Sequence, residues 1–308
     1  IQPTADDQVS VRFLLSPVNP ADINQIQGTY PLLPTLEKGL IDGNAATPFA
    51  IGGNEAVAEI VKVGSSVNVD RYDWLREGSR VVMKAPGFGT WRYSASIDPS
   101  RLLPFNYPGV TDLAAATMMV NPCTAYRMLK DFIPLSPGDT ILQNGANSAV
   151  GQAVVQLARA WGLRSVNIIR GSTQEGSVRP DFDALKKRLE GLGADLVLSE
   201  EEMRSRAAME RIKEVSLGRG IQLGLNCVGG KSAANVARVV EKGGVVVTYG
   251  GMSREPLSIP TGLLIFNDIA IRGFWMTRWN EHASENDRLE MLTELCRLSE
   301  EGKLAVPE

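Results

Sequence analysis

The feature that most constrains this chain begins after Asn121, where short apolar runs alternate with segments of helical periodicity. Such alternation predicts β-α-β units, with a parallel sheet covered by helices on both faces. The sequence predicts six strands, at residues 139–143, 165–169, 195–198, 221–226, 244–249 and 268–272. Six parallel strands are typical of a doubly wound nucleotide-binding domain.

The preceding part of the chain has a different pattern. Residues 9–120 contain short apolar runs, such as AVAEIVKV (56–63) and RVVMKA (80–85), separated by Gly, Pro and Asp at short intervals. This pattern predicts a mainly β barrel or sandwich. A chain of 308 residues exceeds what one hydrophobic core usually supports, so two domains are expected.

The first β-α-β unit, ILQNGANSAVGQAVVQLARAWGLRSVNIIR (141–170), has an unusual turn. It carries Ala146, Ser148 and Gly151 where three glycines usually mark a dinucleotide site. All three are small enough for close backbone approach, and the unpaired N–H groups of the following helix attract a pyrophosphate. An ordinary strand-turn-helix remains the alternative, although the six-strand pattern favours the nucleotide site.

Two helices follow from the periodicity. The first is expected to pack on the sheet through Val150, Val154, Leu157, Ala158 and Trp161. Leu289, Leu292 and Cys296 predict a second helix within 285–302. Two segments rich in Gly, Pro, Ser or Thr, 34–48 and 171–180, are expected to be surface loops.

Arg170 indicates which dinucleotide binds. It ends the second strand, 19 residues after Gly151, where an acidic side chain would bind the ribose hydroxyl of NAD. An arginine there favours NADP, because its guanidinium binds a 2′-phosphate in a bidentate manner. The alternative is a solvated arginine at the start of a loop. Lys186 and Lys187 on the next helix could add positive charge.

Composition excludes several other classes of function. With 32 basic and 35 acidic residues, the chain has no broad surface for nucleic acid. No apolar run reaches 18 residues, so an integral membrane protein is not expected. The dispersed Cys123, Cys227 and Cys296 argue against a disulfide framework. The single histidine, His282, is expected in a solvated loop, and this scarcity of ligands argues against a zinc site.

Several motifs point to one family. Together they resemble the mitochondrial trans-2-enoyl-thioester reductases, zinc-independent members of the medium-chain dehydrogenase/reductase superfamily. The resemblance runs from about residue 9 to the end, and the motifs are NPADINQIQGTYP (19–31), GGNE (52–55), FGTWR (88–92), VNPCTAYRML (120–129), QNGANSAVGQ (143–152), LNCVGGKS (225–232), TYGGM (248–252) and IRGFW (271–275).

The resemblance implies an α/β protein with a Rossmann domain and a mainly β, GroES-like catalytic domain. The expected limits are 1–120 for the first part of the catalytic domain, 121–273 for the NADP-binding domain and 274–308 for a return to the catalytic domain. This return is expected to be truncated, without the family's C-terminal lysine contact to the cofactor. The resemblance also implies NADPH as cofactor, an enoyl-CoA or enoyl-acyl-carrier-protein substrate, a homodimer and a role in fatty acid synthesis in the mitochondrial matrix.

The family's functional residues fall on specific positions. Its proton donor corresponds to Tyr30, and a histidine of zinc-dependent relatives is replaced by Asn54. The resemblance assigns cofactor contacts to Asn121, Asn147, Ser148, Ala149, Val150, Arg170, Arg179, Tyr249, Gly250, Gly251, Met252, Phe274, Trp275, Met276 and Thr277.

The chemistry of these residues suits the implied reaction. Reduction of an enoyl thioester needs a hydride at C3 and a proton at C2, and a tyrosine hydroxyl can donate that proton or position its donor. Taken alone, Tyr30 could equally be a packing residue before Pro31, and Asn121 a turn former before Pro122. Glu55 is expected to be a buried structural carboxylate rather than a general base.

Two rival functions remain at this stage. An NADPH-dependent quinone or alkenal reductase would share the fold, the cofactor and the absence of zinc. A non-catalytic NADP-binding protein that acts through partner contacts would bind the cofactor without turnover. Tyr30 within its full motif favours the enzyme.

Overall fold

The computed structural model describes residues 5–34, 36–37, 48–171 and 179–306. The chain divides into two compact units. Unit 1 contains the residues up to Val120 together with Thr277–Glu300, and unit 2 contains Asn121–Met276 together with the residues from Glu301 onward. The domain limits expected from the sequence, 1–120, 121–273 and 274–308, stay a prediction.

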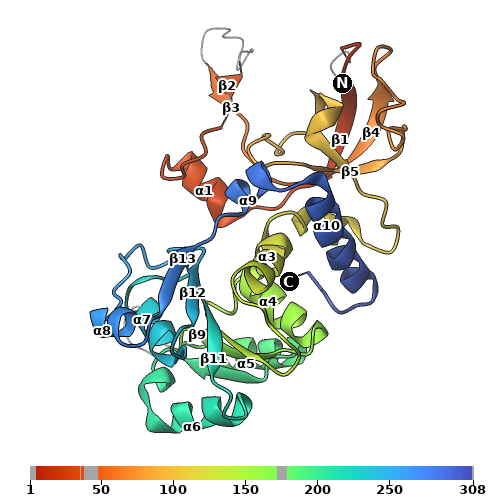
Figure 1. Ribbon diagram of the computed structural model, residues 1–308. Helices are drawn as coiled ribbons and strands as arrows, with labels where there is room; N and C mark the ends of the chain where they lie inside the picture. Colours follow the sequence, from red (N-terminus) through yellow and green to blue (C-terminus); the bar gives the residue numbers. More distant parts are fainter. Residues whose placement is uncertain (1–4, 35, 38–47, 172–178, 307–308) are drawn as a thin grey trace. The chain divides into compact units, whose positions relative to one another are not determined.

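Unit 2 is built on a six-stranded sheet in which every neighbouring pair is parallel. The order is β10-β9-β8-β11-β12-β13 (Figure 1). Each observed strand overlaps one of the six expected strands, and the bounds are β8 (Thr140–Asn144), β9 (Arg164–Ile169), β10 (Leu196–Ser199), β11 (Ile221–Asn226), β12 (Val245–Thr248) and β13 (Ala270–Gly273).

Helices cover both faces of this sheet because the strands bury apolar residues in both directions. One core cluster joins Val166 and Ile168 of β9 to Ile212 of α6, and another joins Ile169 of β9 to Leu189 of α5. The helices of unit 2 are α3 (Asn121–Asp131), α4 (Ala149–Ala160), α5 (Phe182–Leu192), α6 (Arg206–Val215), α7 (Gly230–Val239) and α8 (Thr261–Ile265).

The order of the strands reverses between β8 and β11. From β8 the chain moves outward through β9 and β10, and then returns to place β11 on the other side of β8. The loops that follow β8 and β11 therefore diverge at the carboxyl edge of the sheet. Nucleotides bind at this switch point in doubly wound sheets.

Unit 1 contains an antiparallel sheet in the order β6-β1-β4-β5-β7. Val9, Val11 and Phe13 alternate along β1 and join its core cluster. The strands are β1 (Val9–Leu15), β4 (Val57–Val63), β5 (Arg80–Met83), β6 (Ser94–Ile97) and β7 (Leu102–Pro104), with a separate pair of β2 (Leu36–Glu37) and β3 (Phe49–Ala50). The helices are α1 (Pro20–Ile26), α2 (Asp112–Thr117), α9 (Met276–His282), which begins at the last residue of that part of unit 2, and α10 (Glu285–Glu300).

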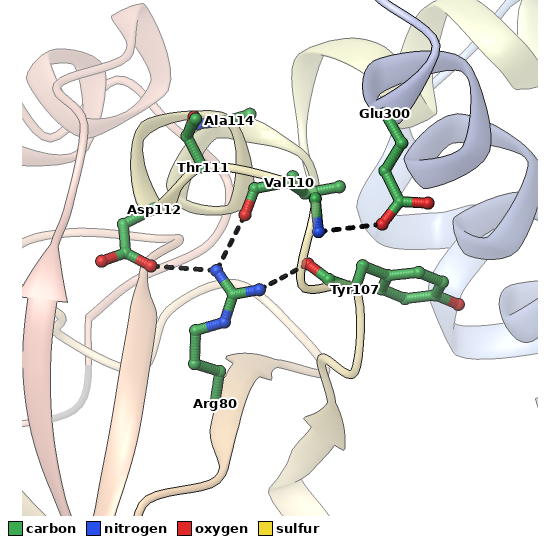
Figure 2. Close-up of polar contacts among 8 residues, drawn as sticks. Arg80, Tyr107, Val110, Thr111, Asp112, Ala114 and Glu300 are labelled. Atoms are coloured by element: carbon green, nitrogen blue, oxygen red, sulfur yellow. Dashed lines mark hydrogen bonds and ion pairs between the residues drawn. The ribbon is translucent and has the colours of Figure 1, made fainter.

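Arg80 fixes the loop between β7 and α2, as Figure 2 shows. Its guanidinium donates to the carbonyl oxygens of Tyr107 (2.5 Å) and Val110 (2.9 Å), and to a carboxylate oxygen of Asp112 (3.0 Å). Glu300, at the end of α10, accepts a hydrogen bond from the Gly109 N–H (3.1 Å). The loop thus holds α10 on unit 1.

Some expectations about local structure were incomplete or wrong. The mainly β region also contains α1 and α2, and His282 is the exposed last residue of α9 rather than part of a loop. Trp161 meets the ring of Tyr126 on α3, with centroids 5.3 Å apart, a helix contact that the sequence did not predict. Leu289 is 36% exposed, although Leu292 and Cys296 are buried as expected.

Two further expectations concern loops and membranes. The predicted loop 34–48 contains β2, and its residues 35 and 38–47 lie outside the described residues, as do 172–178 of the loop 171–180. Within the described part of the chain, no helix has the length and apolar character needed to span a bilayer.

Candidate functional site

The turn between β8 and α4 is the centre of the candidate nucleotide site. Gly145 adopts φ +59°, a left-handed conformation that favours glycine. Ser148 begins the helix as its N-cap, because its Oγ accepts the Gly151 N–H (3.1 Å). The Ser148 N–H donates to the Gly145 carbonyl oxygen (2.9 Å), which closes the turn.

Gly151 permits a close approach that no side chain would allow. A Cβ at this position would lie 2.5 Å from the Ala146 carbonyl oxygen and 2.7 Å from its carbonyl carbon. The start of α4 therefore rests directly on the backbone of the turn. Close packing at Gly151 was predicted from its sequence position. The structure shows that the nearest neighbour of Gly151 is the backbone of the turn itself.

The segments that follow the other strands are hydrogen-bonded to one another. The Tyr249 N–H donates to the Asn226 carbonyl oxygen (3.0 Å), and the Met252 N–H donates to that of Cys227 (3.0 Å). The Phe274 N–H donates to the Thr248 carbonyl oxygen (2.9 Å). The predicted cofactor residues after β12 are thus joined to the end of β11, and Phe274 after β13 is joined to the end of β12, at the same edge of the sheet as the turn.

Tyr249 adds a polar group beside the turn. Its hydroxyl oxygen is buried close to the Cys227 thiol and the Ser148 side chain, and among the described residues it has no hydrogen-bond partner of standard geometry. Burial raises the pKa of Tyr249 well above its usual value, and the nearby thiol adds to this effect. The hydroxyl therefore stays protonated and can act as a hydrogen-bond donor.

Arg170 and Arg179, which are predicted to bind a 2′-phosphate, lie in the connection between β9 and α5. The Arg179 N–H donates to the carbonyl oxygen of Gly171 (2.9 Å), the residue after Arg170. Arg170 is exposed at the end of β9, whereas the Arg179 guanidinium pairs with Asp181 (Nε to Oδ1, 2.5 Å). This pair holds the pKa of the Asp181 carboxyl below its usual value. Arg170 thus presents the more accessible of the two guanidinium groups.

Buried amide side chains form a hydrogen-bonded network at the carboxyl edge of the unit 2 sheet. This network was not predicted from the sequence. Asn144 Nδ2 donates to Asn226 Oδ1 (2.8 Å) and to Ser232 Oγ (2.8 Å), while Asn144 Oδ1 accepts the Cys227 N–H (2.8 Å). The Ser232 hydroxyl in turn donates to Glu200, whose carboxyl has a pKa raised by burial. An asparagine that ends an apolar strand was the available signal, in QNG and LNC.

Tyr30 lies in unit 1, in a turn anchored to α1 on both sides. The Thr29 N–H donates to the Asn24 carbonyl oxygen (2.9 Å), and the Leu32 carbonyl oxygen accepts from Gln25 Nε2 (3.0 Å). Tyr30 itself is half-buried.

Asn54 belongs to a hydrogen-bonded cluster that includes Asp22 and Gln25 of α1. Its Nδ2 donates to Asp22 Oδ1 (2.6 Å) and to Gln25 Oε1 (2.8 Å), and its Oδ1 accepts the Gly87 N–H (2.9 Å). The side chain is therefore engaged in structural contacts where zinc-dependent relatives have a histidine.

Three further predicted cofactor residues occupy defined positions in the chain. Asn121 begins α3, Trp275 follows Phe274, and Thr277 is the first residue of its segment in unit 1. Their cofactor contacts stay predictions, as do those of the remaining predicted residues. Among the described residues, no three His, Cys, Asp or Glu side chains gather in a way that could hold a metal ion.

Comparison with known proteins gives the family. Residues 149–293 match the family profile described as "Zinc-binding dehydrogenase". The mitochondrial enoyl-[acyl-carrier-protein] reductase of Mus musculus is 44% identical over 300 residues, which cover 97% of this chain and 73% of that protein. The chain belongs to the mitochondrial enoyl-[acyl-carrier-protein] reductase family.

Solved structures in the family agree with this fold. The mitochondrial 2-enoyl thioester reductase Etr1p/Etr2p heterodimer from Candida tropicalis has a TM-score of 0.88 and 37% identity, covering 99% of this chain and 83% of that chain. The Etr1p/NADP/crotonyl-CoA complex has a TM-score of 0.89 at 37% identity, with the same coverage. The expected family and the expected pairing of a Rossmann sheet with a mainly β unit are confirmed.

The residues at the carboxyl edge fit NADPH. The first N–H groups of α4 have no partner within the helix, which suits a pyrophosphate at the start of α4. Arg170, rather than an acidic residue, directly follows β9. These features accommodate a 2′-phosphate, which an acidic side chain would repel.

Substitution of Gly151 by alanine tests this fit. The added Cβ would meet the Ala146 backbone at 2.5 Å, so the turn or the start of α4 must move. We expect NADPH to bind at least about tenfold more weakly, a loss of about 1.4 kcal/mol. Titration of NADPH fluorescence gives the Kd.

Gly191→Ala is the matched control for this substitution. Gly191 lies within α5, where a Cβ would meet nothing within 4 Å, and alanine favours helices over glycine. We expect this variant to keep the wild-type Kd. Equal Kd values for Gly151→Ala and the wild type would contradict the assignment of the turn.

Proposed function

We propose that this chain catalyses the NADPH-dependent reduction of trans-2-enoyl thioesters to acyl thioesters in mitochondrial fatty acid synthesis. The observation that carries the proposal is family membership, since relatives named as mitochondrial enoyl-[acyl-carrier-protein] reductases match 97% of the chain at 44% identity. The carboxyl edge of unit 2 supplies a nucleotide site that suits the required cofactor. We place the reaction in the mitochondrial matrix.

The cofactor supplies the hydride that this reduction requires. The chain's own residues bind and orient it: the N–H groups at the start of α4 bind the pyrophosphate, and Arg170 binds the 2′-phosphate. The neutral Tyr249 hydroxyl offers a hydrogen bond close to the same turn. The amide network beneath keeps these loops in one arrangement.

Tyr30 is the proposed proton donor to C2 of the substrate. A phenol is protonated at neutral pH and can transfer or relay a proton. The two hydrogen bonds that anchor its turn to α1 support this role, because a donor must be held in one position to be effective.

The proposed substrates include thioesters of both coenzyme A and acyl carrier protein. The relatives' names mention acyl carrier protein, and Etr1p forms a complex with crotonyl-CoA. A quinone or alkenal reductase is the second enzyme hypothesis, because it needs the same cofactor and no metal. A non-catalytic NADP-binding protein would bind NADPH without oxidising it.

Oxidation of NADPH, followed at 340 nm, separates these functions. We expect a kcat/KM for crotonyl-CoA that exceeds the value for a quinone by at least about 100-fold, with NADPH preferred to NADH because of Arg170. A higher value for the quinone would favour the second enzyme, and NADPH binding without turnover would favour the non-catalytic protein. Comparable rates with NADH would contradict the role of Arg170.

Tyr30→Phe removes only the hydroxyl of the proposed donor. We expect kcat with crotonyl-CoA to fall by about 100-fold or more, because general acid catalysis typically contributes this much. The Kd for NADPH should stay unchanged. Tyr93→Phe, at a tyrosine that is 68% exposed in the same unit, serves as the control. A wild-type kcat in Tyr30→Phe would exclude it as the donor.

We also propose a homodimer formed at the β13 edge. Within the described sheet, β13 is the terminal strand and pairs with β12. Ile265 (65% exposed) and Phe266 (74% exposed) add apolar surface a few residues before it. A terminal strand beside exposed apolar side chains is suited to pairing with a second copy.

Sedimentation equilibrium tests the dimer. We expect about twice the 33.3 kDa of one chain for the wild type, and a shift toward the monomer in Phe266→Glu. Leu113→Glu, at a residue that is 56% exposed in α2, should leave the mass unchanged. A monomeric wild type at micromolar concentration would overturn the proposal.

A further inference from the structure

Glu55 is a buried carboxylate to which none of the functional roles above is assigned. It is 2% exposed and immediately precedes Ala56, at the start of the core of unit 1. Its backbone carbonyl oxygen accepts hydrogen bonds from Ser16 Oγ (2.7 Å) and Thr90 Oγ1 (2.9 Å). The backbone is thus fixed, and the side chain has a defined position.

Each oxygen of the Glu55 carboxylate accepts from a different segment. Oε1 accepts from Asn19 Nδ2 (2.8 Å), and Oε2 accepts from the Val120 N–H (3.0 Å). Asn19 is the N-cap of α1, the helix that anchors the turn of Tyr30. Val120 is bonded covalently to Asn121, one of the residues expected to contact the cofactor. One carboxylate therefore links the segments that lead to both residues.

We propose that Glu55 is a positioning residue for enoyl thioester reduction, which holds the α1 segment of Tyr30 and the segment entering Asn121 in a fixed relation. This inference rests on the proposed function. Glu55 acts through Asn19 and Val120, so we do not place it among the groups that touch the substrate.

The hydrogen-bond chemistry explains why a carboxylate is needed. Both partners are donors, and only a carboxylate presents two acceptor oxygens to them. Asn19 is held at the start of α1, because its backbone N–H donates to Asp22 Oδ2 (2.7 Å) and its backbone carbonyl oxygen accepts the Asp22 N–H (3.0 Å). A glutamine at position 55 would satisfy one donor and point its own N–H₂ group at the other. The glutamine side chain is otherwise almost equal in size.

The proposed linkage depends on the charge of Glu55. Burial raises its pKa to about 8, hydrogen bonds from Asn19 and Val120 lower it, and the Asp22 carboxyl raises it. Asp22, on α1, is the charged group facing it, and the other facing groups are the Asn19 amide and the backbone N–H groups of Val120 and Met119. As pH rises through about 8, the ionised form that accepts both hydrogen bonds becomes dominant.

The substitution Glu55→Gln tests the proposal. With crotonyl-CoA we expect kcat to fall by at least about tenfold, while the Kd for NADPH changes by less than about threefold. The wild-type kcat should rise between about pH 7 and 9, and this rise should be absent in Glu55→Gln. Glu59→Gln, in an ion pair with Arg12 on the same β4 region, makes the same change of charge and should retain the wild-type profile.

A purely structural role predicts a different result. It would lower the melting temperature and the folded fraction, yet leave kcat per folded molecule and the pH profile as in the wild type, and that outcome would overturn the proposal. If Glu55→Gln does not fold, Asn19→Ser replaces it, because serine keeps a helix N-cap but removes the donor to Glu55. We expect a several-fold lower kcat in that variant, and an unchanged kcat would overturn the proposal.

The wild-type assay separates the two hypotheses. A wild type that binds NADPH but reduces no enoyl thioester would refute the proposed function, and this inference with it. An active wild type with an equally active, folded Glu55→Gln would refute the inference alone.

Discussion

The candidate nucleotide site depends on one close contact, between the first turn of α4 and the backbone of the turn after β8. Gly151 makes this contact possible, because any Cβ there would overlap the Ala146 carbonyl group. The contact directs the first N–H groups of α4 toward the turn, where an anion can reach them. It also explains how the turn can replace two glycines by Ala146 and Ser148, since neither position requires the same close approach.

Buried amide side chains connect the turn after β8 to the loop after β11. Asn144 and Asn226 end adjacent strands, and their side chains bind each other and the backbone of Cys227. Polar side chains are costly to bury unless every donor and acceptor is satisfied. This requirement makes the network specific, because it fixes the loops after β8 and β11 in one arrangement. In unit 1, Asn54 and Glu55 have a comparable effect on α1, which anchors the turn of Tyr30.

The sequence predicted the six strands of unit 2 and their class of sheet, because parallel strands buried on both faces are nearly continuous apolar runs. It did not predict α1, whose NPADINQI segment has weak amphipathic periodicity and begins with a capping box. Trp161 fitted the helical pattern, yet periodicity gives only a face of the helix, and its partner proved to be Tyr126. The same limit applies to His282, whose polar surroundings suggested a loop although it ends α9.

For the candidate site, the sequence could place the predicted residues along the chain but could not show their hydrogen bonds. The link from Tyr249 to Asn226 joins residues that are 23 positions apart, which no local pattern reveals. Arg170 and Arg179 illustrate a further limit, since both are basic in sequence, but the structure pairs Arg179 with Asp181 and leaves Arg170 exposed after β9. Partners of this kind depend on tertiary structure.

Amide hydrogen exchange with and without saturating NADPH tests the central claim most directly, namely that the cofactor binds at the carboxyl edge of the unit 2 sheet. The account predicts that NADPH slows exchange by at least about tenfold at residues 146–151 and 249–252. The effect on the amides of α6 should be much smaller. Unchanged exchange at 146–151 under conditions where NADPH is bound would contradict it.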